Sequence, residues 1–207
     1  MSHERKDHWE NVYTTKSPAE VSWTQEVPQT SLSLIYSFGL PRTAAIIDIG
    51  GGDSKLVDHL LAEGYEDITV LDISAAALDR AKQRLGAGSD KVKWIVADIT
   101  EFRPERQYDV WHDRAAFHFL TTPVQIQQYI ATAMQAVKGY MAIGTFSENG
   151  PKKCSGLDIT QYNEEKLQAI LAVGFHKMNC ITEDHTTPFN TTQNFLFCSF
   201  RRKGAKT

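Results

Sequence analysis

From about residue 44 onward, apolar residues follow two patterns, one typical of strands and one typical of helices. Short apolar runs, which are typical of buried strands, occupy residues 44–48, 68–72, 92–97, 108–112 and 140–146. Apolar residues at helical spacing occupy residues 54–63, 74–85, 122–137 and 163–171. This order of strands and helices predicts a doubly wound, mostly parallel α/β sheet.

The pattern changes near the C-terminus. Residues 176–182 and 194–200 are strand-like runs separated by a polar loop, and no helical stretch lies between them. They are therefore expected to pair as an antiparallel hairpin at the sheet edge, which makes the last strand antiparallel.

The segment before the first strand does not belong to this alternation. Residues 1–43 contain Trp9, Tyr13 and Trp23, and residues 31–38 are expected to form a helix. The segment is interpreted as a cap over the ligand edge of the sheet, although its aromatic side chains could instead plug the end of the core. We expect one domain over residues 1–207, with this cap, a core at 44–146, and a substrate-side loop and hairpin at 147–207.

Composition narrows the function classes. A chain of 207 residues with a formal charge of −3 and a pI near 6.2 lacks the basic character of most nucleic-acid-binding proteins. No apolar stretch approaches the length of a membrane span. Cys154, Cys180 and Cys198 are expected to be free thiols in a reducing compartment, with Cys180 and Cys198 as small buried apolar groups. A cytoplasmic location follows as an expectation, with no nucleic-acid or membrane partner and no metal site.

The most informative motif is the glycine turn after the first strand. Gly50 and Gly52 allow a left-handed turn and a close approach of the backbone to a ligand. Asp48 precedes them, and a carboxylate at this place would repel a pyrophosphate. The turn therefore favours a ligand with a cationic end over a dinucleotide.

Acidic residues also stand at the ends of the second and third strands. Asp72 can accept hydrogen bonds from ribose hydroxyls, with Ile73 beside an adenine ring. Asp98 can accept from an adenine amino group, and the backbone N–H of Ile99 can reach a ring nitrogen. The alternative for Asp72 and Asp98 is a structural role in capping a helix or a turn.

With these motifs the chain resembles the class I S-adenosylmethionine-dependent methyltransferases. Residues 48–52 match the glycine-rich first motif of that family, Asp72 its ribose-binding acid, and residues 97–99 its adenine-binding segment. The chain has Ser54 where the family often has another glycine. The resemblance implies a seven-stranded Rossmann-like fold and S-adenosylmethionine as cofactor, with S-adenosylhomocysteine as product. It also implies that Ser54 lies in the cofactor site.

The resemblance assigns two further groups to the cofactor. The backbone at residues 111–113, including His112 and Asp113, would hold the methionine ammonium. The aromatic residues of the cap would close over the cofactor, as in smaller members of the family; they are Trp9, Tyr13 and Trp23.

The segment after the fourth strand is expected to line the methyl-transfer edge. His118, His112 and Arg114 are candidates for general-base work or substrate orientation, and Cys154 lies on a loop at the same edge. The alternatives are a hydrogen-bonded core histidine at His118 and a buried apolar thiol at Cys154. No base is clearly marked, which favours a small acceptor with a soft nucleophile such as a thiol.

Three other functions remain open at this stage. The acceptor can be a protein side chain, or the chain can bind the cofactor without transferring its methyl group. A nicotinamide-dependent oxidoreductase is disfavoured, because the third glycine of the dinucleotide motif is missing. The expected assembly is a monomer or a homodimer.

Overall fold

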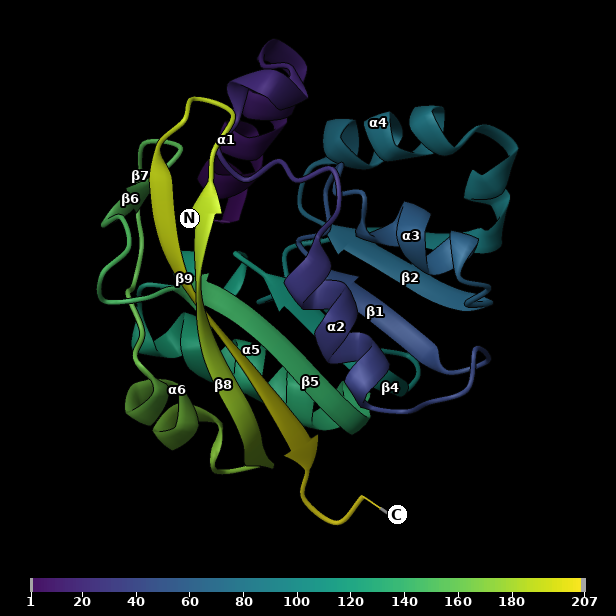
Figure 1. Cartoon of the computed structure of the whole chain (residues 1–207), viewed down its shortest axis with the longest axis vertical. Coiled ribbons are helices and arrows are strands. Elements are labelled where there is room, and N and C mark those ends of the chain that lie inside the picture. Colours follow the sequence, from purple (N-terminus) through teal and green to yellow (C-terminus); the bar gives the residue numbers. More distant parts are fainter. Residues whose placement is uncertain (1, 206–207) are drawn as a thin grey trace.

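The computed structural model describes residues 2–205 and contains a seven-stranded sheet with helices on both faces (Figure 1). The strand order is β3-β2-β1-β4-β5-β9-β8. β9 is antiparallel to both of its neighbours, whereas the first five strands are mutually parallel. The predicted doubly wound sheet with an antiparallel last strand is confirmed. The strands are β1 (Ala45–Ile49), β2 (Asp67–Asp72), β3 (Val92–Val96), β4 (Tyr108–Arg114), β5 (Val137–Phe146), β8 (Phe175–Thr186) and β9 (Thr192–Arg202).

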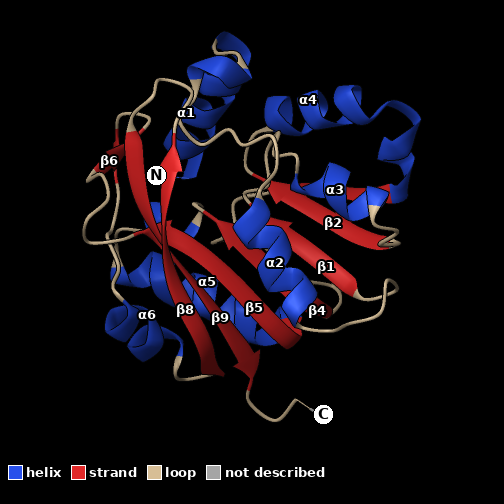
Figure 2. Cartoon of the chain, viewed as in Figure 1, coloured by secondary structure: helices blue, strands red, loops and turns tan. Residues whose placement is uncertain are grey.

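Helices cover both faces of this sheet (Figure 2). Side chains of α2 (Gln29–Ser37), α3 (Leu56–Ala62) and α4 (Ala75–Leu85) pack with Ile46 and Val110 on one face. Side chains of α5 (Pro123–Ala136) and α6 (Glu164–Leu171) pack with Ile47 and Trp111 on the other face. The remaining elements are α1 (Ser2–Thr15), the two-residue strands β6 (Lys153–Cys154) and β7 (Leu157–Asp158), and 3-10 helices at Pro18–Glu20, Gly86–Lys91 and Phe117–Phe119.

The helix caps follow the sequence closely. Ser74 accepts a hydrogen bond from the Ala77 N–H at the start of α4, and Asn163 accepts one from Lys166 at the start of α6. Thr122 opens α5 with a capping box. These three helix starts are where the sequence predicts them.

Several boundaries differ from the prediction, and two of them lie next to the ligand edge. β4 continues through Arg114 instead of ending at residue 112, and the turn that follows it begins at Ala115 with a φ of 69°. α3 begins at Leu56 rather than at residue 54, because the Ser54 N–H is used in a turn to the Gly51 carbonyl. The first correction changes which residues of β4 reach the ligand edge.

The N-terminal segment attaches to both ends of the ligand edge. α1 lies beside α4 (Figure 1), and the Glu10 carboxylate accepts hydrogen bonds from the Ser74 hydroxyl and the Ala76 N–H. On the opposite side, His185 of β8 contacts the Ser22 carbonyl and the Gln25 side chain. Residues 2–30 therefore span from α4 to the C-terminal hairpin.

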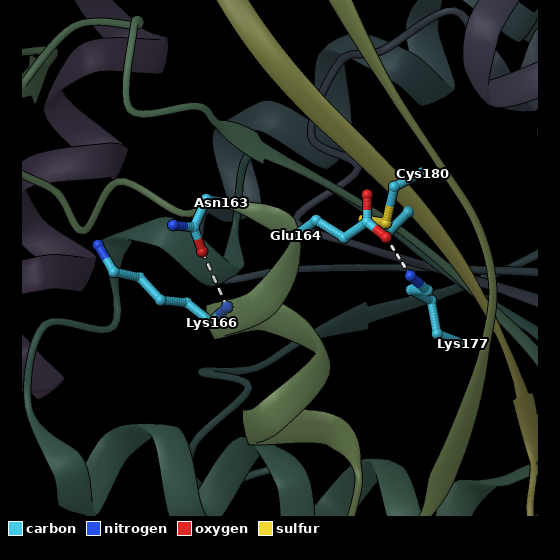
Figure 3. Close-up of a disulfide and its surroundings, with 6 residues drawn as sticks. Asn163, Glu164, Lys166, Lys177 and Cys180 are labelled. Atoms are coloured by element: carbon cyan, nitrogen blue, oxygen red, sulfur yellow. Dashed lines mark hydrogen bonds and ion pairs between the residues drawn. A yellow bond between two sulfur atoms is a disulfide. The ribbon is translucent and has the colours of Figure 1, made fainter.

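The hairpin contains a disulfide, which contradicts the expectation of free thiols at Cys180 and Cys198. The two residues face each other directly across β8 and β9, and a bond joins their sulfur atoms (Figure 3). The register of the hairpin brings them together, and the sequence spacing alone does not show that register. Cys154 is the free cysteine of the chain and is buried. The inference of a reducing compartment loses its basis for the paired residues, and the cytoplasmic location stays a prediction.

Within residues 2–205, none of the helices is both long enough and apolar enough to cross a membrane. The same residues contain no cluster of histidine, cysteine and carboxylate side chains that could hold a metal ion.

Candidate active site

A cavity lies at the carboxyl ends of the parallel strands, between the sheet and the N-terminal segment. It encloses about 860 Å³ of empty space, including its open mouth. Asp72, Ile73, Asp98 and Ile99 line it from the ends of β2 and β3.

Asp72 lies where β2 ends and is almost fully buried. The backbone N–H groups of Ser74 and Gly52 donate to its carboxylate, but burial is the larger effect and raises the pKa of Asp72 to about 7. A buried acid on a cavity wall is suited to accept hydrogen bonds from a ligand.

Asp98 lies at the end of β3 and has a partner that the sequence did not suggest. The Arg5 guanidinium of α1 donates to Asp98 Oδ2 over 2.6 Å, and the other oxygen accepts from the Thr100 N–H and hydroxyl. Arg5 lines the cavity as well. The first helix therefore closes this end of the cavity by an ion pair to the acid that the sequence analysis assigns to adenine.

The glycine turn approaches its neighbours so closely that side chains are excluded. Gly50 has a φ of +64°, and a Cβ there would lie 2.6 Å from the Ala116 Cβ. Gly52 has a φ of +50°, and a Cβ there would lie 2.6 Å from the Tyr13 hydroxyl. The turn thus needs glycine for both its conformation and its packing, as the sequence predicts.

A second cavity borders the other side of this turn, and Asp48, Gly50, Ser54 and His112 are among its lining residues. Asp48 and His112 are direct neighbours on β1 and β4, and His112 Nδ1 lies 2.7 Å from Asp48 Oδ1. The pair is buried, and His112 Nε2 lies 2.8 Å from the Ser31 hydroxyl of α2. The partner that allows a carboxylate inside the first strand is therefore His112.

The aromatic residues of the N-terminal segment form one cluster over the first cavity. The Trp9 ring centroid lies 5.0 Å from that of Phe119 and 5.7 Å from that of Trp23. The ring centroids of Tyr13 and Trp23 lie 6.2 Å apart. All four side chains line the cavity, so the interpretation of residues 1–43 as a cap agrees with their position.

Arg114 lies between the two cavities and lines both. Its Nη1 donates to the Trp23 carbonyl over 2.9 Å. Burial lowers the pKa of Arg114 to about 10, which leaves the guanidinium charged at neutral pH. Arg114 thus brings a positive charge to the centre of the site.

His118 is fully buried and does not line either cavity. Its Nδ1 accepts from the Phe146 N–H, and burial together with the Arg114 charge lowers its pKa to about 3. The imidazole is therefore neutral, with its proton on Nε2, and it has no free lone pair with which to act as a base. This geometry is that of the core histidine weighed as the alternative.

Cys154 lines the first cavity, and burial raises the pKa of its thiol to about 11. A thiol with this pKa is protonated at neutral pH and is a poor nucleophile. Cys154 is therefore a protonated thiol in the cavity wall.

Asp113 lies on the opposite face of the sheet from its neighbours His112 and Arg114, because side chains alternate along β4. Its carboxylate accepts from the Tyr129 hydroxyl of α5 and from the N–H groups of Ala116 and Phe117. The backbone that lines the first cavity after β4 belongs to residues 114–116 and not to 111–113.

The sequence did not identify several residues that line the first cavity. Phe146 and Phe195 line the cavity from the ends of β5 and β9, and Arg5 lines it from α1. The phenylalanines stand in ordinary strand patterns that could equally face the core. Arg5 stands in a mixed-charge stretch that shows no preferred partner, so no signal in the sequence identifies it.

Comparison with known proteins finds methyltransferases. A family model described as a methyltransferase domain matches residues 46–140. A malonyl-[acyl-carrier protein] O-methyltransferase of Anoxybacillus flavithermus is 33% identical over 110 residues, which cover 52% of this chain and 40% of the relative. An eEF1A lysine and N-terminal methyltransferase of Mus musculus is 23% identical over 117 residues, which cover 56% of this chain and 16% of the relative. The match thus spans less than half the length of these curated relatives.

Solved structures share the fold over nearly the whole chain. A SAM-dependent methyltransferase from Anabaena variabilis superposes with a TM-score of 0.76 at 12% identity and covers 98% of this chain and 95% of its own. A 1,6-didemethyltoxoflavin-N1-methyltransferase of Burkholderia thailandensis, solved with S-adenosylhomocysteine, has a TM-score of 0.68 at 18% identity, with 98% and 90% covered.

Proposed function

We propose that this chain is a class I S-adenosylmethionine-dependent methyltransferase and that it transfers a methyl group to a small-molecule acceptor; the methyltransferase domain model that matches residues 46–140 and the methyltransferases among its relatives support this. The observation that supports this most directly is the position of Asp72. It is a buried carboxylate on the cavity wall at the end of β2, beside a turn that tolerates only glycine. That arrangement suits the ribose of a nucleoside cofactor.

The residues around the two cavities fit the remaining parts of S-adenosylmethionine. Ile73 and Ile99 would hold the adenine between apolar side chains. Asp98 would accept a hydrogen bond from the adenine amino group once the Arg5 side chain moves away from it. Asp48 would supply negative charge near the methionine ammonium. When bound, S-adenosylmethionine supplies a methyl carbon to a lone pair of the acceptor, while the carbon–sulfur bond breaks and its electron pair stays on sulfur.

The chain's own contribution to the reaction would be alignment and the exclusion of water. Trp9, Trp23 and Phe119 form an apolar roof, and Phe146 and Phe195 form an apolar wall. Neither His118 nor Cys154 is suited to remove a proton, for the reasons given above. A thiol or another soft nucleophile, which needs no base at neutral pH, is therefore the acceptor that we propose.

Two measurements test this function. Calorimetry with S-adenosylhomocysteine should give one binding site on the intact protein. A screen of thiols, amines, carboxylates and phenols, followed by S-adenosylhomocysteine release, should then identify the acceptor, with thiols among the best substrates. A folded protein that binds no S-adenosylhomocysteine would refute the proposal. Methylation of amines or phenols in preference to every thiol would refute its acceptor class.

A further inference from the structure

One edge of the Arg114 guanidinium is free. Nη1 donates to the Trp23 carbonyl, but Nε and Nη2 are shielded from solvent and have no hydrogen-bond partner among residues 2–205. Nε and Nη2 form the side-on edge of a guanidinium, where two parallel N–H groups point the same way. The unsatisfied atoms are thus a matched pair of donors.

The neighbouring acids do not fill this edge. Glu183 and Asp48 are near enough for their charges to stabilise the guanidinium. The Glu183 carboxylate, however, accepts a hydrogen bond from the Thr30 hydroxyl, and Asp48 Oδ1 is paired with His112. Neither acid is hydrogen-bonded to Arg114.

Aromatic side chains that line the first cavity lie near the Arg114 guanidinium. The guanidinium carbon lies 5.5 Å from the Phe195 ring centroid, and its charge acts on the Cys154 thiol. Phe119 and Phe146 line the same cavity. Arg114 is therefore a charged group in an aromatic wall, whereas Asp72 and Asp98 lie at the ends of β2 and β3.

Two shielded donors of a cation that lack hydrogen-bond partners are costly, and a carboxylate in bidentate geometry is the ligand that best satisfies them. A neutral aromatic molecule would fill the wall but would leave both donors unsatisfied. The site therefore favours an acid over its neutral analogue.

We propose that Arg114 determines acceptor specificity by binding a carboxylate of the methyl acceptor through Nε and Nη2. This inference rests on the proposed function and adds the class of acceptor: a small acid with an apolar or aromatic body. The carboxylate serves as an anchor, since its pairing with a guanidinium makes it a weaker nucleophile, and the methyl group goes to another atom of the same molecule. The electron pair of that atom forms the new bond, and a thiol acceptor loses its proton to water.

The test is a titration of the protein already loaded with S-adenosylhomocysteine. The probes are matched pairs of an acid and its amide: 2-mercaptobenzoate, benzoate and indole-3-acetate, each beside its carboxamide. We expect at least one acid to bind the wild-type protein about tenfold or more tightly than its amide, which is the size of effect that a charge-assisted bidentate contact produces. In Arg114→Gln this preference should fall to about twofold or less. If no acid is preferred by the wild-type protein, or if the preference survives in Arg114→Gln, the proposal is wrong.

The cofactor also has a carboxylate, and a second comparison separates the two sources. S-adenosylhomocysteine contains the amino-acid group, and 5′-methylthioadenosine lacks it. If Arg114→Gln weakens only S-adenosylhomocysteine and leaves the acid preference unchanged, Arg114 binds the cofactor and the acceptor proposal is refuted.

Controls keep the result interpretable. Arg5→Gln removes another cavity arginine, one that is already paired with Asp98, and should leave the acid-to-amide ratio unchanged. Arg114→Lys keeps the charge but lacks the two parallel N–H donors, so it should retain only part of the preference for acids over amides. Failure of the wild-type protein to bind S-adenosylhomocysteine would refute the proposed function itself, and this outcome is distinct from a lost acid preference.

Discussion

His112 Nδ1 and Asp48 Oδ1 lie 2.7 Å apart across two neighbouring strands, in the buried interior at the base of the glycine turn. A carboxylate accepts hydrogen bonds only, so the Nδ1 proton points to Asp48. The other ring nitrogen lies 2.8 Å from the hydroxyl of Ser31 on α2, so three side chains are linked by hydrogen bonds. His112 thereby fixes the carboxylate that we assign to the cationic end of the cofactor.

Substitution of Asp48 should affect the amino-acid end of the cofactor selectively. Asp48→Asn keeps the shape and removes the charge, so the affinity for S-adenosylhomocysteine should fall by about tenfold to a hundredfold. The affinity for 5′-methylthioadenosine, which has no ammonium group, should change by about twofold or less. Calorimetry with both ligands measures the difference. Ser31→Ala, which leaves the Asp48 charge in place, is the matched control, and equal losses for both ligands in Asp48→Asn would contradict the assignment.

Asp72 should make stability depend on pH. Its pKa in the folded protein is about 7, above the ordinary value of 3.8, so the folded state binds more protons than the unfolded state between these values. Stability should therefore fall as pH rises from about 4 to about 7, by an amount on the order of a few kcal/mol. Asp72→Asn should flatten part of this slope in urea unfolding at pH 5 and pH 8. An identical slope in both proteins would show that Asp72 ionises normally.

Gly52 should be intolerant of a side chain. Gly52→Ala places a Cβ 2.6 Å from the Tyr13 hydroxyl. It also holds an alanine at a φ of +50°, a left-handed conformation that alanine disfavours. We expect a loss of roughly 1–2 kcal/mol in stability from the backbone alone, together with a large loss of S-adenosylhomocysteine affinity. Gly64→Ala is the matched control, because Gly64 has a φ of +84° with no atom near its added Cβ among the described residues. It should lose stability and keep its affinity; a parallel loss of affinity there would point to general destabilisation.

The disulfide should be detectable without any functional assay. Cys180 and Cys198 are 18 residues apart in sequence, and closing a loop of this length is worth about 3 kcal/mol in the chain-entropy account. Alkylation of the unfolded, non-reduced protein should modify one cysteine, Cys154, and reductant should lower the melting temperature. The Cys180→Ala variant should show no such effect of reductant. Three alkylated cysteines in the non-reduced protein would mean that the bond does not form.

The sequence predicts the sheet and the place of the strand-end acids because both depend on local patterns. The apolar runs define the strands, and the acids at the ends of parallel strands must meet at one edge of the sheet. Ser74, Thr122 and Asn163 mark helix starts through contacts that lie within four residues.

The features that the sequence did not reveal depend on contacts between distant segments. Arg5 and Asp98 are 93 residues apart, and the Cys180–Cys198 pair depends on a hairpin register that the sequence leaves open. His118 and Arg114 could not be told apart as candidates until the alternation along β4 and the turn after it were known. Their burial and hydrogen bonds, not their residue types, separate a core histidine from a charged group at the site.

If Asp72 and its neighbours form a cofactor site, calorimetric titration with S-adenosylhomocysteine must detect binding there. We predict one site on the wild-type protein and an affinity at least about a hundredfold lower in Asp72→Ala, since two hydrogen bonds to a carboxylate are lost at about 1.5–3 kcal/mol each. Circular dichroism of the variant verifies that it is folded. No binding by the folded wild-type protein, or an affinity unchanged by Asp72→Ala, would show that Asp72 does not bind the cofactor.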